Sequence, residues 1–374
     1  MLTMQPILPI GPYDWEKSLL PQDEFDERLA AVRAVMVERN WRGMILFGSI
    51  ADPGAVTYIT NFTPKLGWGM VLLPVKGDPA LLADGGPRML PAAQALTYVT
   101  DLRPARNPTG VLTDWLDEIE GDGGLAVVDF AAMPHGVHRQ VMSLDAIVGA
   151  EDGSDLVRDI RRRKSARENA LIDRAAEILG DAAGMLRQSA QSGEHIQAAI
   201  QAAEAKAFAE GAQDVRALYS LDGGCNLGAF ESPEEVKGDQ FTAFLAVKYR
   251  GYWAEGLLTI GNEASPARQS AAKALAAMTQ AAVPGASADD LGRALNNEAG
   301  SLASHSFTEG SLGNGSGLSL TEAPFLDMGS DTQLAEGDII TLRAGLSDDQ
   351  AGHALLSAML RVGAGGPQIL YSTA

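Results

Sequence analysis

The chain has 374 residues, of which 46% are hydrophobic and 21% charged, and its formal net charge is -19 at pH 7. This length is typical of two globular domains, and the acidic balance argues against nucleic acid or an anionic membrane as a partner. Cys225 is the only cysteine, so no internal disulfide is possible. With no basic N-terminal region followed by a long apolar run, the expected location is the cytoplasm.

The first half of the sequence alternates a predicted helix with predicted strands. Apolar residues recur at helical spacing in residues 23–41. Apolar runs of strand length and β-branched content follow. These runs cover residues 44–49, 55–62, 69–75, 79–84 and 124–130. Alternating helices and strands predict an α/β domain over residues 1–155.

The second half begins with a predicted helix start at Ser165, because Ser165 and Glu168 have the spacing of a capping box. Alanine-rich helices are expected at residues 194–211 and 265–285, and Ser287 with Asp290 predicts another helix start. The predicted strands are residues 216–221, 240–247, 251–261, 338–346 and 354–363. This order predicts an α+β domain over residues 156–374, with an antiparallel sheet covered by helices on one side.

Several motifs occur in a fixed order along the chain. The stretch "AVTYITNF" precedes "GMVLLPVKGDPALLA", and then come "IRRRKSARENALIDRAAEI", "YRGYWAEGLLTIG", "GNGSGLSLTEAPFL", "LAEGDIITLRAGL" and "MLRVGAGGPQIL". Together they resemble the creatinase, prolidase and aminopeptidase P superfamily over roughly residues 20 to 372. The resemblance implies a creatinase/prolidase-like N-terminal domain and a C-terminal pita-bread domain of the catalytic type.

The resemblance also identifies the positions at which most of these enzymes hold two divalent metals. Two aspartates, a histidine and two glutamates are the usual ligands, and they activate a hydroxide for peptide hydrolysis. In this chain the five positions carry Phe244, Glu255, Asn314, Arg343 and Ser357, and two further histidine positions fall near Phe230 and on Thr321. Because an arginine among the ligands would repel cations, we expect no metal, and no other cofactor is implied.

Creatinase belongs to the same superfamily and hydrolyses a small carbon–nitrogen bond with side-chain acid–base groups. For this chain the resemblance therefore implies a metal-independent hydrolase, or a lyase, acting on a non-peptide C–N bond of a small polar molecule that bears a carboxylate. Glu255 is the expected general base or nucleophile, and Glu322 and His353 are further catalytic candidates. The expected substrate-binding residues are Arg343, Asn314, Thr321, Phe230, Phe244 and Trp253.

Each of these residues also has a structural interpretation. Glu255 and Arg343 can simply neutralise each other, and Asn314 between two glycines is a common turn residue. Glu322 can face solvent or hold a backbone amide, and Cys225 lacks a recognisable histidine partner and is expected to be inert. Two other functions remain open: a pseudoenzyme that binds a ligand without turnover, and a metallopeptidase that cleaves Xaa-Pro dipeptides.

The expected partners are a small-molecule substrate and a second copy of the chain. Members of the superfamily often form homodimers in which a loop of one N-terminal domain closes the neighbour's pocket. The corresponding loop here is residues 61–69, and Lys65 and Trp68 are expected to reach the ligand. The alternative for Lys65 is a solvated surface position.

Overall fold

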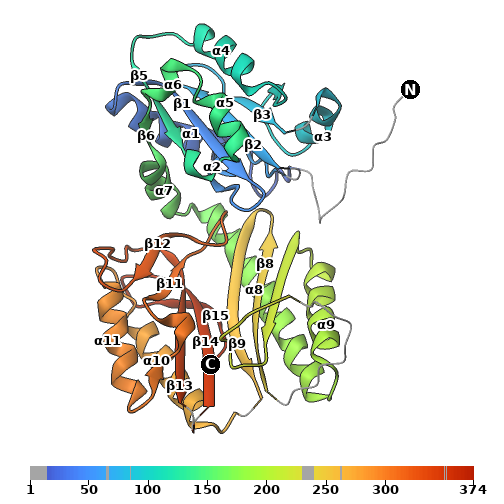
Figure 1. The fold of residues 1–374 in the computed structure, drawn as a ribbon, viewed down its shortest axis with the longest axis vertical. Coiled ribbons are helices and arrows are strands. Elements are labelled where there is room, and N and C mark those ends of the chain that lie inside the picture. The colour runs from blue at the N-terminus through green and yellow to red at the C-terminus, as the bar shows by residue number, and fades with distance from the viewer. Residues whose placement is uncertain are drawn as a thin grey trace. The chain divides into compact units, whose positions relative to one another are not determined.

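The computed structural model describes residues 15–64, 67–84, 86–229, 240–261, 263–348, 350 and 352–374. Lys65 and Phe230 lie outside these residues. The chain divides into two compact units, Met1–Arg161 and Arg162–Ala374, and Figure 1 shows the helices and strands of each. The boundary expected near residue 155 falls within helix α7, Ser154–Arg162. No helix in the described part of the chain is long and apolar enough to cross a membrane.

The first unit is an α/β domain built on one mixed six-stranded sheet, as the alternation of elements predicts. The strand order is β4-β3-β2-β1-β5-β6; β1 pairs with β2, and β2 with β3, in antiparallel fashion, and the other pairs are parallel. The strands are β1 (Trp41–Ser49), β2 (Trp68–Pro74), β3 (Ala80–Ala83), β4 (Asp101–Pro104), β5 (Gly124–Val128) and β6 (Glu151–Asp152). The helices are α1 (Gln22–Glu38), α2 (Gly54–Thr60), α3 (Leu90–Gln94), α4 (Pro108–Glu118), α5 (His135–Val141), α6 (Asp145–Val148) and α7.

The strand predicted at residues 55–62 is wrong, because this run forms helix α2, which ends at Asn61 in the left-handed conformation. Every residue of α2 is buried, so the run has no polar face from which a helical period can be recognised. Thr60 Oγ1 donates to the carbonyl of Val56 at 2.7 Å, which satisfies a β-branched polar residue inside a helix. Tertiary burial therefore overrides the β propensity of this segment.

The second unit contains two antiparallel sheets where the sequence predicts one. The first is β7-β8-β9, and the second is β12-β11-β13-β14-β15, with β10 paired to β13. Helices α8 and α9 pack on the first sheet, and α10 and α11 on the second (Figure 1). The strands are β7 (Asp214–Ser220), β8 (Phe241–Tyr249), β9 (Tyr252–Ile260), β10 (Ala303–Ser304), β11 (Ser311–Gly315), β12 (Glu322–Asp327), β13 (Ile339–Asp348), β14 (Gly352–Arg361) and β15 (Gln368–Ser372). The helices are α8 (Ala166–Gln191), α9 (Ile196–Ala209), α10 (Pro266–Ala281) and α11 (Ala288–Ala299).

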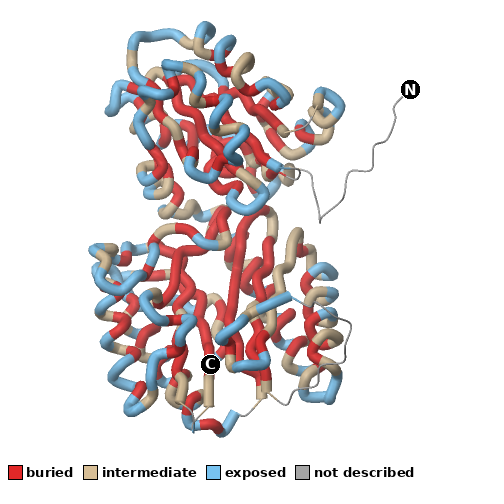
Figure 2. Tube along the Cα trace, viewed as in Figure 1, coloured by how far each residue is buried: buried red, intermediate tan, exposed pale blue. Residues whose placement is uncertain are grey.

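Side-chain hydroxyls join the two sheets where β9 meets β14. Ser357 Oγ accepts from the amide of Leu257 at 2.8 Å and lies 3.3 Å from the Leu257 carbonyl, to which it can donate. Thr259 Oγ1 accepts from the amide of Leu355 at 2.9 Å, and Thr373 Oγ1 donates to the Leu257 carbonyl at 2.9 Å. These residues are fully buried, so the hydroxyls replace ladder hydrogen bonds that the backbones do not make directly. Figure 2 shows that β9 and β14 are buried along most of their length.

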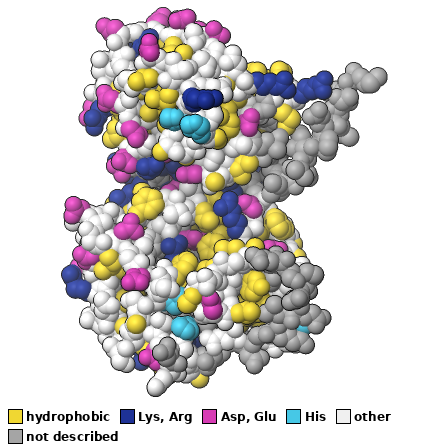
Figure 3. Space-filling view, in the orientation of Figure 1, with side chains coloured by type: hydrophobic (Ala, Val, Ile, Leu, Met, Phe, Trp, Pro, Cys, Tyr) yellow, Lys and Arg dark blue, Asp and Glu magenta, His cyan; other side chains and the backbone are white. Residues whose placement is uncertain are grey.

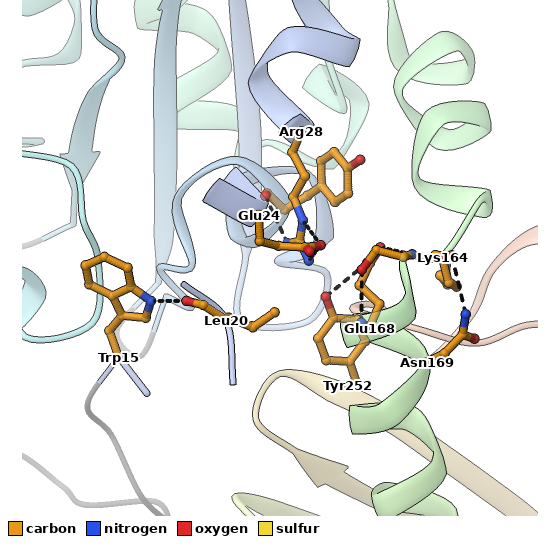
Figure 4. A network of polar contacts seen from close by, with 10 residues as sticks. Trp15, Leu20, Glu24, Arg28, Lys164, Glu168, Asn169 and Tyr252 are labelled. Carbon is orange, nitrogen blue, oxygen red and sulfur yellow. Dashed lines mark hydrogen bonds and ion pairs between the residues drawn. The ribbon is translucent and has the colours of Figure 1, made fainter. Parts of the chain in front are cut away.

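The predicted start of α8 at Ser165 is confirmed. Ser165 Oγ accepts from the Glu168 amide at 3.1 Å, and Glu168 Oε2 accepts from the Ser165 amide at 2.9 Å. Glu168 Oε1 also accepts from the hydroxyl of Tyr252 at 3.0 Å (Figure 4). The first turn of α8 is thereby fixed to Tyr252, the first residue of β9, which is one position before Trp253 and three before Glu255. The capping box of Ser287 and Asp290 at the start of α11 is confirmed as well.

Candidate functional site

The candidate site begins on the face of the three-stranded sheet that is turned away from α8. On the α8 side, Gly256 packs against Tyr371, which in turn contacts Gly180 of α8. Because side chains alternate along a strand, Trp253 and Glu255 project from the opposite face. The antiparallel register sets Glu255 beside Ala246 and Trp253 beside Lys248. We call this side of β7, β8 and β9 the open face.

Glu255, Asn314 and Arg343 form a hydrogen-bonded cluster. Arg343 Nη2 donates to Glu255 Oε1 at 2.6 Å and to Asn314 Oδ1 at 2.6 Å. Asn314 Nδ2 donates to its neighbouring carbonyl, that of Gly315, at 2.8 Å and lies 3.4 Å from Glu255 Oε1. Glu255 and Asn314 are 2% and 3% exposed, and the Arg343 side chain is 15% exposed. Three positions that are distant in sequence are therefore brought together, as the resemblance implies.

The glycines on either side of Asn314 explain how it reaches this position. Gly313 has a φ of 153°, and a Cβ there would lie 2.0 Å from the carbonyl oxygen of Thr341 on β13. A Cβ on Gly315 would lie 2.2 Å from the carbonyl of Ala323. Only glycine permits such close approach on both sides of β11. The two glycines thus hold residue 314 within β11, between β12 and β13. Asn314 is therefore a strand residue, and the interpretation as a turn residue is wrong.

The donor set of this cluster does not fit a pair of divalent metals. It supplies one carboxylate and one amide oxygen, and the Arg343 guanidinium already bonds to both. Of the other ligand positions, Phe244 has no donor atom, and Ser357 uses its hydroxyl to join the sheets. A divalent cation prefers several anionic oxygens and would be repelled by the fixed guanidinium. Among the described residues no group of three or more His, Cys, Asp or Glu side chains is arranged to hold a metal.

Phe244 and Trp253 lie on the open face, on either side of the Ala246–Glu255 pair. Phe244 is half-buried and pairs with Leu257. Trp253 is 2% exposed, and its amide donates to the carbonyl of Gly317 at 2.8 Å, which ties β9 to the glycine-rich loop after β11. Both residues are thus next to Glu255 along the sheet, where the sequence prediction puts them.

Glu322 and Thr321 follow that loop and have different surroundings. Glu322 is 7% exposed, forms an ion pair with Lys164, and accepts from the amide of Ser319 at 3.3 Å. Its carboxylate closes the loop, so the interpretation as a backbone-amide acceptor is the one its contacts favour. Thr321 is exposed and makes no hydrogen bond within the described part of the chain.

His353 lies apart from the cluster. It is on β14 opposite Ser347, and its ring is 6.0 Å from that of His305 in an edge-on arrangement. Its Nδ1 is enclosed and has no partner among the residues that the structure describes. Since Ser357, four positions along the same strand, is the residue opposite Arg343, His353 is not brought to Glu255.

Cys225 has a histidine neighbour that the sequence did not reveal. Its Sγ lies 3.9 Å from Nε2 of His305. His305 Nδ1 accepts from the amide of Phe307 at 3.0 Å, which leaves Nε2 as the donor to the carbonyl of Gly223 at 3.1 Å. Burial lowers the pKa of His305 and so favours this neutral form. With both ring nitrogens engaged, His305 has no lone pair to accept the thiol proton.

Trp68 was expected to reach a ligand, but in the first unit it lies in the hydrophobic core. It is 7% exposed on β2 and packs against Phe47, with ring centroids 6.0 Å apart, in the hydrophobic core of that unit. A core side chain in this position is not free to reach a ligand. The companion residue Lys65 falls outside the described residues, as does Phe230 in the second unit.

Two cations on the open face were not singled out from the sequence. Lys248 pairs with Trp253 across β8 and β9, and Arg216 of β7 pairs with Ala246. The Arg216 Cζ and Lys248 Nζ atoms lie 4.6 Å and 5.4 Å from the centroid of the Trp253 ring. Burial lowers the pKa of Lys248 to about 8, while Asp214 opposes this change and Arg216 adds to it. The available sequence clue was that Arg216 lies in a predicted strand and Lys248 directly after one, at positions that can point to the same side of the sheet as Glu255.

The chain was compared with protein-family models, with curated protein sequences and with solved structures. The family model for metallopeptidase family M24 matches residues 166–364, whereas no curated protein sequence matches the chain. The structure is similar to the prolidase from Pyrococcus horikoshii OT3, at 19% identity and a TM-score of 0.75, covering 93% of this chain and 99% of that one. It is also similar to the Xaa-Pro dipeptidase from Bacillus anthracis, at 19% identity, a TM-score of 0.72 and coverage of 92% and 97%.

A third similar structure is the X-Pro aminopeptidase from Thermotoga maritima MSB8, at 16% identity and a TM-score of 0.75, covering 92% of this chain and 97% of that one. At these identities the likeness establishes the fold, and it confirms the expected α/β N-terminal domain followed by a pita-bread domain. The family model covers more than half of the chain, and the protein therefore belongs to metallopeptidase family M24.

Proposed function

We propose that this protein is a metal-independent hydrolase, or a lyase, that acts on a non-peptide C–N bond of a small, polar molecule bearing a carboxylate. The observation that carries the proposal is the position of the Arg343 guanidinium, 2.6 Å from oxygens of both Glu255 and Asn314. The positively charged Arg343 side chain thus lies among the residues at the metal-ligand positions of the family. The protein is proposed to act as a homodimer in the cytoplasm.

Arg343 has donors left for a substrate. Only its Nη2 bonds to Glu255 and Asn314, and neither Nε nor Nη1 has a partner among the described residues. These N–H groups suit a carboxylate, which accepts charge-assisted hydrogen bonds from guanidinium. A bound carboxylate would hold the adjacent C–N bond beside Glu255, so binding and chemistry would use the same cluster.

Glu255 is the proposed proton carrier. For hydrolysis, its carboxylate takes a proton from water while the water oxygen bonds to the carbon of the C–N bond. The C–N bond then breaks, and the nitrogen leaves with the proton that Glu255 returns. The Asn314 amide, held by the Gly315 carbonyl, is placed to orient a polar group of the substrate.

Cleavage of Xaa-Pro dipeptides is the second candidate, because similar structures carry the names prolidase and Xaa-Pro dipeptidase. That chemistry ordinarily relies on a metal-activated hydroxide, which the donor set here does not support. Ligand binding without turnover is the third, in which the Glu255–Arg343 pair only neutralises buried charge.

The test is a turnover screen with and without a chelator. Small amidines, ureas and betaines that carry a carboxylate are compared with Xaa-Pro dipeptides. We expect turnover of a member of the first group, unaffected by EDTA, and a loss of about 100- to 10,000-fold in kcat for Glu255→Gln. Glu263→Gln is the control, since Glu263 is exposed and pairs with Arg268. Chelator-sensitive cleavage of a dipeptide would reject the proposal.

A further inference from the structure

Lys248 of β8 is a buried cation with no hydrogen-bonded counterpart among the described residues. It is 8% exposed, and none of the described residues forms an ion pair or a hydrogen bond with its ammonium group. Its polar neighbours on β7 are Asp214 and Arg216, which contact each other with Nε and Oδ2 3.7 Å apart. Glu255 on β9 is already paired with Arg343. A buried ammonium with three unused donors is costly unless something else accepts from it.

The surroundings of Lys248 favour an anion. Among the residues that the structure describes, two carboxylates, Asp214 and Glu255, and three cations, Arg216, Lys248 and Arg343, lie on the open face or face it. The balance of these described charges is positive, in a chain with a net charge of -19. Figure 3 shows acidic and basic side chains mixed over the visible face of the second unit, with no general basic surface. The positive balance is therefore a local feature of this sheet face.

The geometry also relates Lys248 to the Glu255 cluster. Lys248 pairs with Trp253, and Glu255 is two positions along the same strand, so the two residues are diagonal neighbours on one face. Diagonal neighbours in an antiparallel pair have Cα atoms about 7–8 Å apart. The small side chain of Ala246 lies between Glu255 and Arg216 in the register and takes up little of this space.

We infer that Lys248, assisted by Arg216 and backed by the Trp253 ring, binds a second anionic group of the ligand, so that the ligand class is a small dicarboxylate. One carboxylate binds Arg343 and the other binds Lys248. This inference rests on the proposed function for the placement of the first carboxylate. The lowered pKa of Lys248 is consistent with an ammonium that lacks a counterion until the ligand arrives.

Calorimetric titration of the full-length protein with succinate and with butyrate tests the inference. The two probes have equal chain length and differ in one carboxylate. We expect succinate to bind about 10- to 100-fold more tightly, the range for hydrogen bonds to a charged group. Lys248→Met should remove this preference and leave butyrate affinity within about twofold, because only the second carboxylate loses its partner. Lys206→Met is the matched control, since Lys206 lies on α9 and pairs with Glu210.

Equal affinity of the unmodified protein for the two acids, or no binding of either, would overturn the inference, and neither result depends on a variant that folds. Loss of the succinate preference in Lys206→Met as well would also overturn it. The proposed function fails separately. Succinate binding that requires Lys248, without turnover of any C–N substrate, rejects the function and keeps the inference. Turnover of monocarboxylates that Lys248→Met leaves unchanged keeps the function and rejects the inference.

Discussion

Arg343 Nη2 and Glu255 Oε1 lie 2.6 Å apart although the residues are 88 positions apart in the sequence, and their contact joins the two sheets of the second unit. Glu255 is on β9 and Arg343 on β13, so the ion pair and the hydroxyls of Ser357 and Thr259 connect the same two sheets. The pair thus has a structural role in addition to its proposed role in binding.

The first prediction concerns the coupling within this pair. Glu255→Ala should lower the free energy of unfolding by about 3 kcal/mol, because it leaves the guanidinium largely buried without its carboxylate. Adding Arg343→Ala should cost less than the sum of the single changes, with a coupling of about 1–3 kcal/mol. Urea unfolding of the four proteins measures both values. Strict additivity would show that the contact is energetically unimportant.

The second prediction concerns metal content. Elemental mass spectrometry of the purified protein, before and after incubation with manganese or zinc, should find well below one metal ion per chain, because the Arg343 guanidinium already bonds to Glu255 Oε1 and Asn314 Oδ1 and would repel a cation there. Removing metals with EDTA should leave the melting temperature unchanged, since a bound ligand would have stabilised the fold. One or two tightly held ions per chain would show that the donor-set argument is wrong and make Xaa-Pro dipeptides the first substrates to try.

The third prediction concerns the junction of the sheets. Ser357→Ala should lower the free energy of unfolding by about 1–3 kcal/mol, because the buried amide of Leu257 loses its acceptor. Ser330→Ala is the matched control, since the Ser330 hydroxyl is enclosed and has no partner among the described residues. That change should be nearly neutral. If thermal or chemical unfolding shows equal losses for both, the hydroxyl bridge does not stabilise the junction.

The fourth prediction is a pH dependence set by Lys248. Its pKa falls from 10.5 to about 8 on folding, so the charged form is disfavoured in the folded state. Below pH 8 the full penalty is present, about 3 kcal/mol. Between pH 8 and 10.5 the unfolded chain binds more protons, so the free energy of unfolding rises with pH through this window.

Lys248→Met should abolish that rise and stabilise the protein at pH 7. Tyr98 acts in the opposite direction, because burial raises its pKa and the folded state holds its proton longer. Both proteins contain Tyr98, so the difference between their stability curves isolates Lys248. Parallel curves from pH 7 to 10.5 would show that Lys248 carries no such penalty.

Local sequence patterns predicted many of the elements, among them α8, β9 and β13, but not α4, β11 or β15. The capping residues Ser165 and Ser287 mark the starts of α8 and α11, because a cap depends on atoms three residues away. The one misassigned element, α2, is buried on all sides and lacks a polar face. The division of the second unit into two sheets was not predictable, because hydroxyls of Ser357 and Thr259 take the place of a continuous ladder.

The motifs alone predicted that Glu255, Asn314 and Arg343 meet, since the resemblance relates each position to a shared site. The tertiary structure decided how they meet: one guanidinium nitrogen bonds to both oxygens, which is a matter of side-chain direction at ångström scale. The tertiary structure also shows that Trp68 lies in a hydrophobic core, that His353 is distant from Glu255, and that the Lys248 ammonium lies over the Trp253 ring. The sequence determined the family and many of the elements because both depend on short-range patterns and their order. Strand register and burial decided the chemistry of the open face because they bring together residues that no local pattern connects.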